Sequence, residues 1–302
     1  MENSAAFVAG WGAGIFGLIV GHPMDTIKTE QQMSLGQRLS IRESVKIIVA
    51  KNGISGLYKG MYFPLMSSGI LNAVFFGVYA FSLSSLQSKR GNNPNNILPT
   101  NSGYSYDNFL SGSIGGLAQS FISCPSELIK IRIQTGKGKC KAKFLDSNKR
   151  RKSSTFLVTR DIYQKYGING FFIGAVPTIC RDVISNAIYM VSYQYFRYNL
   201  NGEENLKPGN LEILVAGGIA GVLSWLPVIP FDTVKSRIQA DEFHNRTYKG
   251  MIDCSHRLYK NEGIHGFFKG TTMITLRSIP VNAAIFYSYH LLMKIFVPHI
   301  HH

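Results

Sequence analysis

The chain has 302 residues, of which 45% are hydrophobic and only 16% are charged, and its formal net charge is +15. Soluble domains usually carry about 25% charged residues, so this composition favours a membrane protein. The four cysteines are dispersed and form no CxxC pair, so neither a disulfide framework nor a zinc site is expected.

One sequence pattern occurs three times along the chain. Each copy has a proline, an acid two residues later and a lysine three residues after the acid, and the three copies are Pro23, Asp25, Lys28; Pro125, Glu127, Lys130; and Pro230, Asp232, Lys235. A glutamine recurs nine residues after each proline, at Gln32, Gln134 and Gln239. Such agreement without gaps predicts three tandem repeats, at 1–100, 101–205 and 206–302.

Each repeat contains two apolar segments that flank a polar stretch. The expected segments, in chain order, are 5–34, 62–86, 107–135, 175–199, 211–240 and 272–297. Each is long enough to cross a bilayer core of roughly 30 Å. Helical spacing with mixed charge predicts short surface helices at 41–51, 155–165 and 251–260. The predicted fold is an all-α membrane protein with six transmembrane helices in three pseudo-threefold repeats.

The basic residues concentrate in the loops inside the repeats, above all at 137–152, and are sparse in the links between repeats. By the positive-inside rule, the loops inside the repeats share one compartment and both termini lie on the other side. The net charge therefore has a topological explanation, and no nucleic-acid partner is expected.

The prolines are expected to kink three transmembrane helices toward a common axis. A single charge at the bilayer centre costs roughly 2.5–3.5 kcal/mol, so the six charges that follow the kinks need partners in a polar interior. One possibility is pairing within each helix, between residues three apart. The threefold repetition favours the other possibility, a ring in which each acid meets a lysine of another repeat and closes one end of a central cavity.

The three motifs resemble the signature of the mitochondrial carrier family (solute carrier family 25), and the resemblance covers the whole chain. It implies a multi-pass monomer in the mitochondrial inner membrane, with both termini toward the intermembrane space. It also implies a matrix gate that pairs Asp25 with Lys130, Glu127 with Lys235, and Asp232 with Lys28, braced by Gln32, Gln134 and Gln239. Glu30 departs from the pattern, because the other repeats have Arg132 and Arg237 at this position.

Two glycine patterns accompany the motifs. The pairs Gly10/Gly14, Gly112/Gly116 and Gly217/Gly221 have GxxxG spacing, which favours close helix packing. Three later turns end in Gly60, Gly174 and Gly270, and they resemble the cardiolipin-binding motifs of the family. Helix N-termini there offer N–H groups to a lipid phosphate, although ordinary turn chemistry explains the glycines equally well.

A symmetric gate cannot select a substrate, so specificity is expected where the repeats differ. Arg181 and Arg277 occupy equivalent places in the second helices, where the first repeat has Ser67, and Asp182 follows Arg181. Charged residues at this depth mark a solute pathway, unless the arginines extend to an interface or Arg181 merely pairs with Asp182. An Arg–acid pair suits a zwitterion, since each charge of the solute finds an opposite charge.

These positions coincide with the substrate contact points of the family, where an Arg–acid pair resembles carriers of amino acids and carnitine. Ser67, Leu71 and Phe75 form a neutral first contact point, and Phe75 and Tyr189 offer aromatic faces to a quaternary ammonium. Other segments look most like members 45, 47 and 48 of the family. The expected substrate is a carnitine-like, methylated or basic amino acid, or a related organic cation.

Several other expectations follow from the sequence. The opposite gate lacks a complete ion pair, because its positions hold Ala80, Gln194 and His290, then Leu83, Arg197 and Met293. No nucleophile–base arrangement or nucleotide fingerprint is evident, so no enzyme activity, cofactor or metal is expected, and the C-terminal histidines read as a solvated tail. A carrier for carboxylates or nucleotides, a proton-leak carrier and a non-transporting scaffold remain as alternatives.

Overall fold

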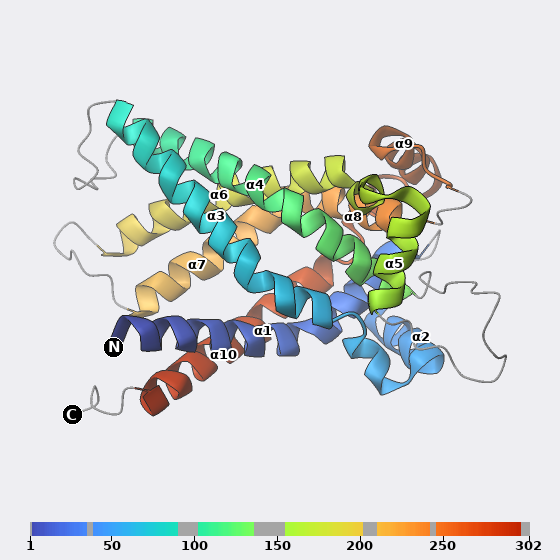
Figure 1. Ribbon diagram of the computed structural model, residues 1–302, viewed down its shortest axis with the longest axis horizontal. Helices are drawn as coiled ribbons and strands as arrows, with labels where there is room; N and C mark the ends of the chain where they lie inside the picture. The colour runs from blue at the N-terminus through green and yellow to red at the C-terminus, as the bar shows by residue number, and fades with distance from the viewer. Residues whose placement is uncertain are drawn as a thin grey trace.

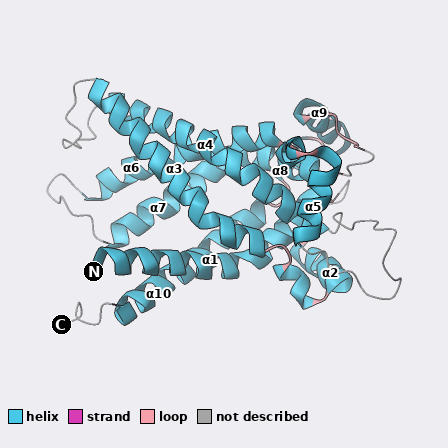
Figure 2. Cartoon of the chain, viewed as in Figure 1, coloured by secondary structure: helices cyan, strands magenta, loops and turns pink. Residues whose placement is uncertain are grey.

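The structure is a computed structural model that describes residues 2–34, 39–89, 102–135, 155–201, 210–241 and 246–296. In the first repeat the helices are α1 (Glu2–Met33), α2 (Ile41–Asn52), η1 (Ile54–Tyr58) and α3 (Tyr62–Lys89). In the second they are α4 (Ser102–Thr135), α5 (Thr155–Tyr166), η2 (Ile168–Phe172) and α6 (Ala175–Asn201). In the third they are α7 (Asn210–Trp225), η3 (Leu226–Val228), α8 (Ile229–Ala240), α9 (Met251–Glu262), η4 (Ile264–Phe268) and α10 (Thr271–Phe296). These segments contain no strand (Figure 2), and the predicted all-α fold is confirmed.

The long helices lie side by side, and the short helices α2, α5 and α9 gather at one end (Figure 1). We call this the short-helix end. The start of α1 and the end of α10 lie at the opposite end. Helix α3 packs on α4, α4 on α6 and α6 on α7, while α10 packs along α1 and joins the third repeat to the first.

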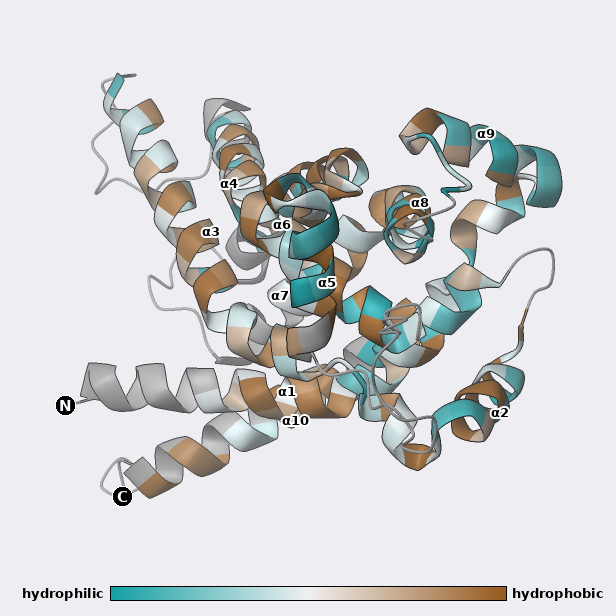
Figure 3. Cartoon of the chain, turned by 45° about the vertical axis from the view of Figure 1, so that its right-hand side comes forward, coloured by the Kyte–Doolittle hydropathy of each residue, from teal (hydrophilic) through white to brown (hydrophobic). Residues whose placement is uncertain are grey.

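The protein is apolar outside and polar inside. Large hydrophobic side chains such as Met66, Ile70 and Phe121 are more than half exposed, whereas Asp25, Asp232 and other charged groups are buried. Figure 3 shows hydrophobic residues along α3 and hydrophilic ones on α5 and α9. Such a distribution suits a bilayer, where the solvent around the protein is hydrocarbon. Within the described residues, Ile54–Lys89 and Ala216–Ala240 are also long and apolar enough to cross a membrane by composition alone.

The first helix of the third repeat is interrupted, which corrects the expectation of one kinked but continuous helix at 211–240. Helices α1 and α4 run on through Pro23 and Pro125. In the third repeat, η3 separates α7 from α8. Pro227 precedes Pro230 by three residues, so two backbone N–H donors are missing within one turn, and the helix tightens into a 3₁₀ turn there.

Three hydrophobic clusters lie at the short-helix end, where each short helix packs on the first long helix of its own repeat, and another, around Phe75, Tyr79 and Met190, lies between α3 and α6. Val158 and Ile162 of α5 bury themselves against α4 around Leu128, and Cys254 and Leu258 of α9 do the same against α8. Burial raises the pKa of the Cys254 thiol to about 12. These cores fix the short helices as a platform beneath the charged interior.

The GxxxG pairs serve different purposes in different repeats. A side chain at Gly112 or Gly116 would clash with α6, with a Cβ atom 2.9 Å from the Asn186 carbonyl oxygen and 2.6 Å from that of Asp182. The expected close packing is therefore present in the second repeat. A methyl group added at Gly14 or Gly221 would meet no atom within 4 Å, so the close packing expected there is absent from this state.

Candidate functional site: a charged central cavity

A cavity of about 570 Å³ lies among the long helices and is lined by residues from all three repeats. Five basic and four acidic side chains reach it, which leaves one uncompensated positive charge among the described lining residues. The bases are Lys28, Lys130, Lys235, Arg181 and Arg277, and the acids are Asp25, Glu127, Asp182 and Asp232.

Three ion pairs join the repeats in a cycle. The Lys130 Nζ atom lies 2.9 Å from Asp25 Oδ2, and the Lys28 Nζ atom lies 2.7 Å from Asp232 Oδ2. Lys235 pairs with Glu127. Each lysine thus reaches the acid of another repeat rather than the acid three residues before it in its own helix. These are the pairings that the family resemblance implies, and they tie α1, α4 and α8 together.

The three glutamines beside the ring are all buried but make different contacts. The Gln32 amide donates to Asp232 Oδ2 at 2.9 Å and so supports an acid of the ring. The Gln134 amide donates to the Thr26 hydroxyl at 3.1 Å, and the Gln239 amide donates to the Ile173 carbonyl at 3.4 Å. In this state the expected brace contacts a ring acid through Gln32 and supports neighbouring helices and turns through the other two.

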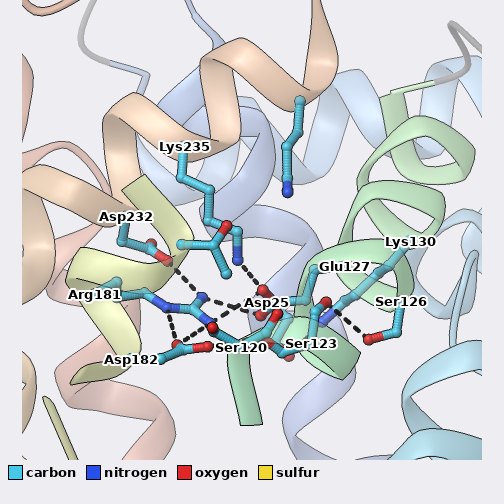
Figure 4. A network of polar contacts seen from close by, with 12 residues as sticks. Asp25, Ser120, Ser123, Ser126, Glu127, Lys130, Arg181, Asp182, Asp232 and Lys235 are labelled. Carbon is cyan, nitrogen blue, oxygen red and sulfur yellow. Dashed lines mark hydrogen bonds and ion pairs between the residues drawn. The ribbon is translucent and has the colours of Figure 1, made fainter. Parts of the chain in front are cut away.

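Arg181 lies at the centre of the acidic cluster (Figure 4). Its guanidinium forms a fork with Glu127, with Nη1–Oε1 and Nη2–Oε2 distances of 3.0 Å. It also donates to Asp182 Oδ1, from Nε at 2.8 Å, and reaches Asp232 Oδ1 at 3.3 Å. The side chain of Asp182 accepts a further bond from the Ser123 hydroxyl at 2.6 Å. The internal Arg181–Asp182 contact, which the sequence left open, therefore exists, and Arg181 reaches ring acids as well.

Arg277 connects the cavity to the ring from another helix. Its Nη1 atom lies 3.0 Å from Asp25 Oδ1, and a third of its side chain is exposed. Its Nε atom is buried and has no hydrogen-bond partner among the residues that the structure describes. Both arginines use their N–H groups to bond to acids of the ring. A solute carboxylate that binds the same N–H groups would therefore have to displace a ring acid.

The neutral contact positions also line the cavity. Ser67, Leu71, Phe75 and Tyr189, the contact positions that the family resemblance implies, all border it. Phe75 and Tyr79 stack with their ring centroids 6.1 Å apart, and the Tyr79 hydroxyl donates to Asn108 at 2.5 Å. The expectation of a weak opposite gate depends in part on Arg197, His290 and Met293, and their side chains lie outside the described residues. The basic loop 136–154 also lies outside the described residues.

The three turn glycines contact the ring helices of the next repeat. Gly60, Gly174 and Gly270 have φ angles of 84°, 81° and 84°, a region that suits glycine. A Cβ atom on Gly60 would lie 3.2 Å from the Lys130 carbonyl oxygen, and one on Gly270 would lie 3.1 Å from Lys28 Cγ. The glycines therefore hold the turns against the ring, which gives them a packing role apart from any lipid.

The basic residue of the third turn points inward. Lys269 is 8% exposed and lies 2.9 Å from Glu262 Oε2, which also accepts from Arg237 at 2.9 Å. In the first repeat, Glu30 stands at the position of Arg237 and pairs with Lys51 at 2.9 Å, next to Asn52, which aligns with Glu262. The departure at Glu30 therefore has a basic partner of its own, and this pair is more exposed than the buried Arg237–Glu262 pair.

Trp225 is one of the cavity residues that were not predicted from the sequence. Trp225, the last residue of α7, lines the central cavity, and its ring centroid lies 4.9 Å from Lys28 Nζ. It stands five residues before Pro230, where the other repeats have Leu18 and Ser120. The comparison between repeats that singles out Arg181 and Arg277 in the second helices would also reveal this asymmetry in the first helices.

The sequence matches the family described as "Mitochondrial carrier protein" over residues 1–90, 101–204 and 207–299. The chain belongs to the mitochondrial carrier family. A carrier of this family resides in the mitochondrial inner membrane and moves solutes. "Solute carrier family 25 member 45" from Mus musculus is 36% identical over 96% of this chain and 98% of its own length.

Two further relatives of this carrier have names that state a solute. The "Mitochondrial basic amino acids transporter" from Homo sapiens is 34% identical over 93% of this chain and 86% of its own length. The "Mitochondrial carnitine/acylcarnitine carrier-like protein" from Arabidopsis thaliana is 34% identical over 91% of this chain and 92% of its own length. The resemblance drawn from the three motifs is confirmed, and these relatives are solute carriers.

Proposed function

We propose that this carrier transports carnitine-like, methylated or basic amino acids, or related organic cations, by alternating access. The observation that carries the proposal is that the central cavity offers a separate receptor to each end of such a solute. Arg181 and Arg277 can receive one carboxylate, and the rings of Phe75 and Tyr189 can receive a cationic group. A solute with two or more carboxylates would bring more negative charge than the described lining compensates, which disfavours a dicarboxylate or a nucleotide.

The two arginines are the groups proposed to receive the carboxylate. A forked guanidinium–carboxylate contact is strong and directional, and Arg181 makes such a contact with Glu127 in this state. The solute carboxylate would replace that acid at Arg181 or replace Asp25 at Arg277. In either case an acid of the ring loses a partner, so substrate binding weakens the ring and allows the closed end to open.

The cationic part of the solute needs a different receptor. Each acid that lines the cavity already has a basic partner: Asp25 has Lys130 and Arg277, Glu127 has Lys235 and Arg181, and Asp232 has Lys28 and Arg181, while Asp182 has Arg181. A primary ammonium would have to break one of these pairs. A methylated ammonium requires no hydrogen-bond acceptor, and the rings of Phe75 and Tyr189 suit it.

The proposal includes an orientation and a lipid site. The short-helix end would face the matrix and both termini the intermembrane space, with the ion-pair ring as the matrix gate. A second cavity, of about 290 Å³, contains Gly174 at the start of α6 and Tyr248, Lys249 and Gly250 before α9. Helix N-termini and basic side chains suit a lipid phosphate, so cardiolipin is proposed there. The carrier is proposed to act as a monomer.

Uptake into proteoliposomes tests this function. The purified carrier would be assayed with labelled carnitine, basic amino acids, choline, nucleotides and keto acids, with denatured protein as the control. Saturable uptake of carnitine, a methylated or basic amino acid, or choline is expected. Uptake confined to nucleotides or keto acids would refute the proposed solute class, and no uptake of any solute would favour a scaffold.

A further inference from the structure

Near the ring, the third repeat has an aromatic residue, Trp225, at a position where the other two repeats have none. Trp225 ends α7, immediately before the 3₁₀ turn that contains Pro227, and borders both the central cavity and a cavity of about 310 Å³ beside α10. The equivalent residues are Leu18 and Ser120, which have no π face. Of the three ring lysines, Lys28 is the one whose acidic partner lies in the repeat with the tryptophan.

The indole ring already holds a cation. The Lys28 Nζ atom lies 4.9 Å from the ring centroid and 2.7 Å from Asp232 Oδ2. Attraction between a cation and an aromatic face operates within about 6 Å and is strongest for tryptophan. Lys28 therefore has two partners in the closed ring, the carboxylate of Asp232 and the π face of Trp225.

A solute cation that enters the cavity encounters the same face. The cavity acids are all paired, so the described receptors for a further positive charge are aromatic rings, and Trp225 is the best cation–π partner among them. Two cations repel each other, so a solute ammonium and the Lys28 ammonium would not share one face of the ring.

We propose that Trp225 is a positioning and specificity residue whose indole face is occupied in turn by Lys28 and by the cationic group of the solute. Solute binding then deprives Lys28 of one of its two partners and weakens the Lys28–Asp232 pair. This inference rests on the proposed function, because it requires a cationic solute. It adds a route by which the cationic end of the solute, and not only its carboxylate, acts on the ring.

Transport kinetics with a matched pair of solutes test the proposal. Carnitine and its carbon isostere 3-hydroxy-5,5-dimethylhexanoate have the same shape and carboxylate but differ in the positive charge. In Trp225→Leu, KM for carnitine should rise by a factor of roughly 2 to 30, the range expected for one cation–π contact. The apparent affinity of the isostere, measured as inhibition of uptake, should change less than about twofold. Trp225→Phe keeps an aromatic face and should recover most of the loss.

Fluorescence provides a direct measurement of the contact. The chain has two tryptophans, so Trp11→Phe leaves Trp225 as the only indole reporter. Adding carnitine to this variant should change the Trp225 emission, as should Lys28→Met in the same background. An emission that stays constant while carnitine saturates transport would overturn the proposal, as would an equal loss of affinity for carnitine and its isostere in Trp225→Leu.

The outcomes distinguish this proposal from the function on which it rests. If the unmodified carrier takes up no cationic solute, the proposed function fails and the role of Trp225 fails with it. If the unmodified carrier transports carnitine but Trp225→Leu retains the same KM, the function stands and the inference about Trp225 is wrong. Circular dichroism and thermal unfolding of each variant separate either result from misfolding.

Discussion

Replacement of Arg181 separates a structural role of this arginine from a role in substrate binding. In Arg181→Met, Asp182 loses its basic partner and keeps the bond from Ser123, although it remains only 6% exposed. Removing one partner of a buried ion pair costs about 3–5 kcal/mol. For a protein of this size the midpoint of thermal unfolding should fall by on the order of 10 °C.

The double variant Arg181→Met/Asp182→Asn removes the orphaned charge and should regain most of this stability. It should still bind substrate more weakly than the unmodified carrier, because Arg277 is then the one described guanidinium left in the cavity to receive the carboxylate. The readout is the rise of the unfolding midpoint on adding carnitine, which for the unmodified carrier corresponds to about 2.7 kcal/mol at one hundred times Kd. Arg181→Lys keeps the charge without the fork and is the matched control.

A specific result would refute this reasoning. If the double variant is stable and its unfolding midpoint rises with carnitine as in the unmodified carrier, Arg181 serves only the internal contact with Asp182. If the single variant is as stable as the unmodified carrier, the buried network contributes less than the geometry indicates.

Three further predictions concern stability and are checked by thermal unfolding of purified variants. Gly116→Ala should destabilise the carrier by about 1–3 kcal/mol, since a Cβ atom would lie 2.6 Å from a carbonyl oxygen of α6, whereas Gly221→Ala has open space and should be neutral or slightly stabilising. Arg237→Met should cost about 1.5–3 kcal/mol, because the buried Glu262 carboxylate loses its bonds from Arg237 but keeps Lys269, whereas Glu30→Met breaks an exposed pair and should cost less than about 1 kcal/mol. Gly60→Ala should cost about 1–2 kcal/mol through its positive φ angle and its contact with α4.

The repeat pattern predicted much of the fold, because the same residue types recur at the same spacing in all three repeats. The ion-pair ring is one example, since a buried charge needs a partner and the repetition indicates where the partner lies. The break at Pro227 could also have been predicted from the sequence, because two prolines three residues apart leave too few N–H donors for a continuous helix. The repeated proline alone predicts only a kink, and Pro227 has no counterpart in the other two repeats.

Other features depend on three-dimensional placement and were not accessible from the sequence. The contacts of Arg181 with Glu127 and Asp232 join three different helices, so no spacing along the chain encodes them. Lys269 belongs to a turn that resembles a cardiolipin-binding motif, but its side chain turns toward Glu262. The GxxxG pairs pack unequally, since Gly112 and Gly116 lie against α6 while Gly14 and Gly221 face open space. The motif is the same in all three repeats, so the sequence does not reveal this difference.

The central claim is that substrate binding takes acids of the ring away from their partners and opens the short-helix end. Spin labels at Ser55 and Asn169, exposed residues of η1 and η2 in two different repeats, would report this opening as a distance between labels in a variant without native cysteines. The account predicts that carnitine, or another solute that the carrier takes up, lengthens this distance in the parent, and that the same concentration lengthens it less in the Arg181→Met/Asp182→Asn background. An unchanged distance in the parent, with a solute that it transports, would contradict the account.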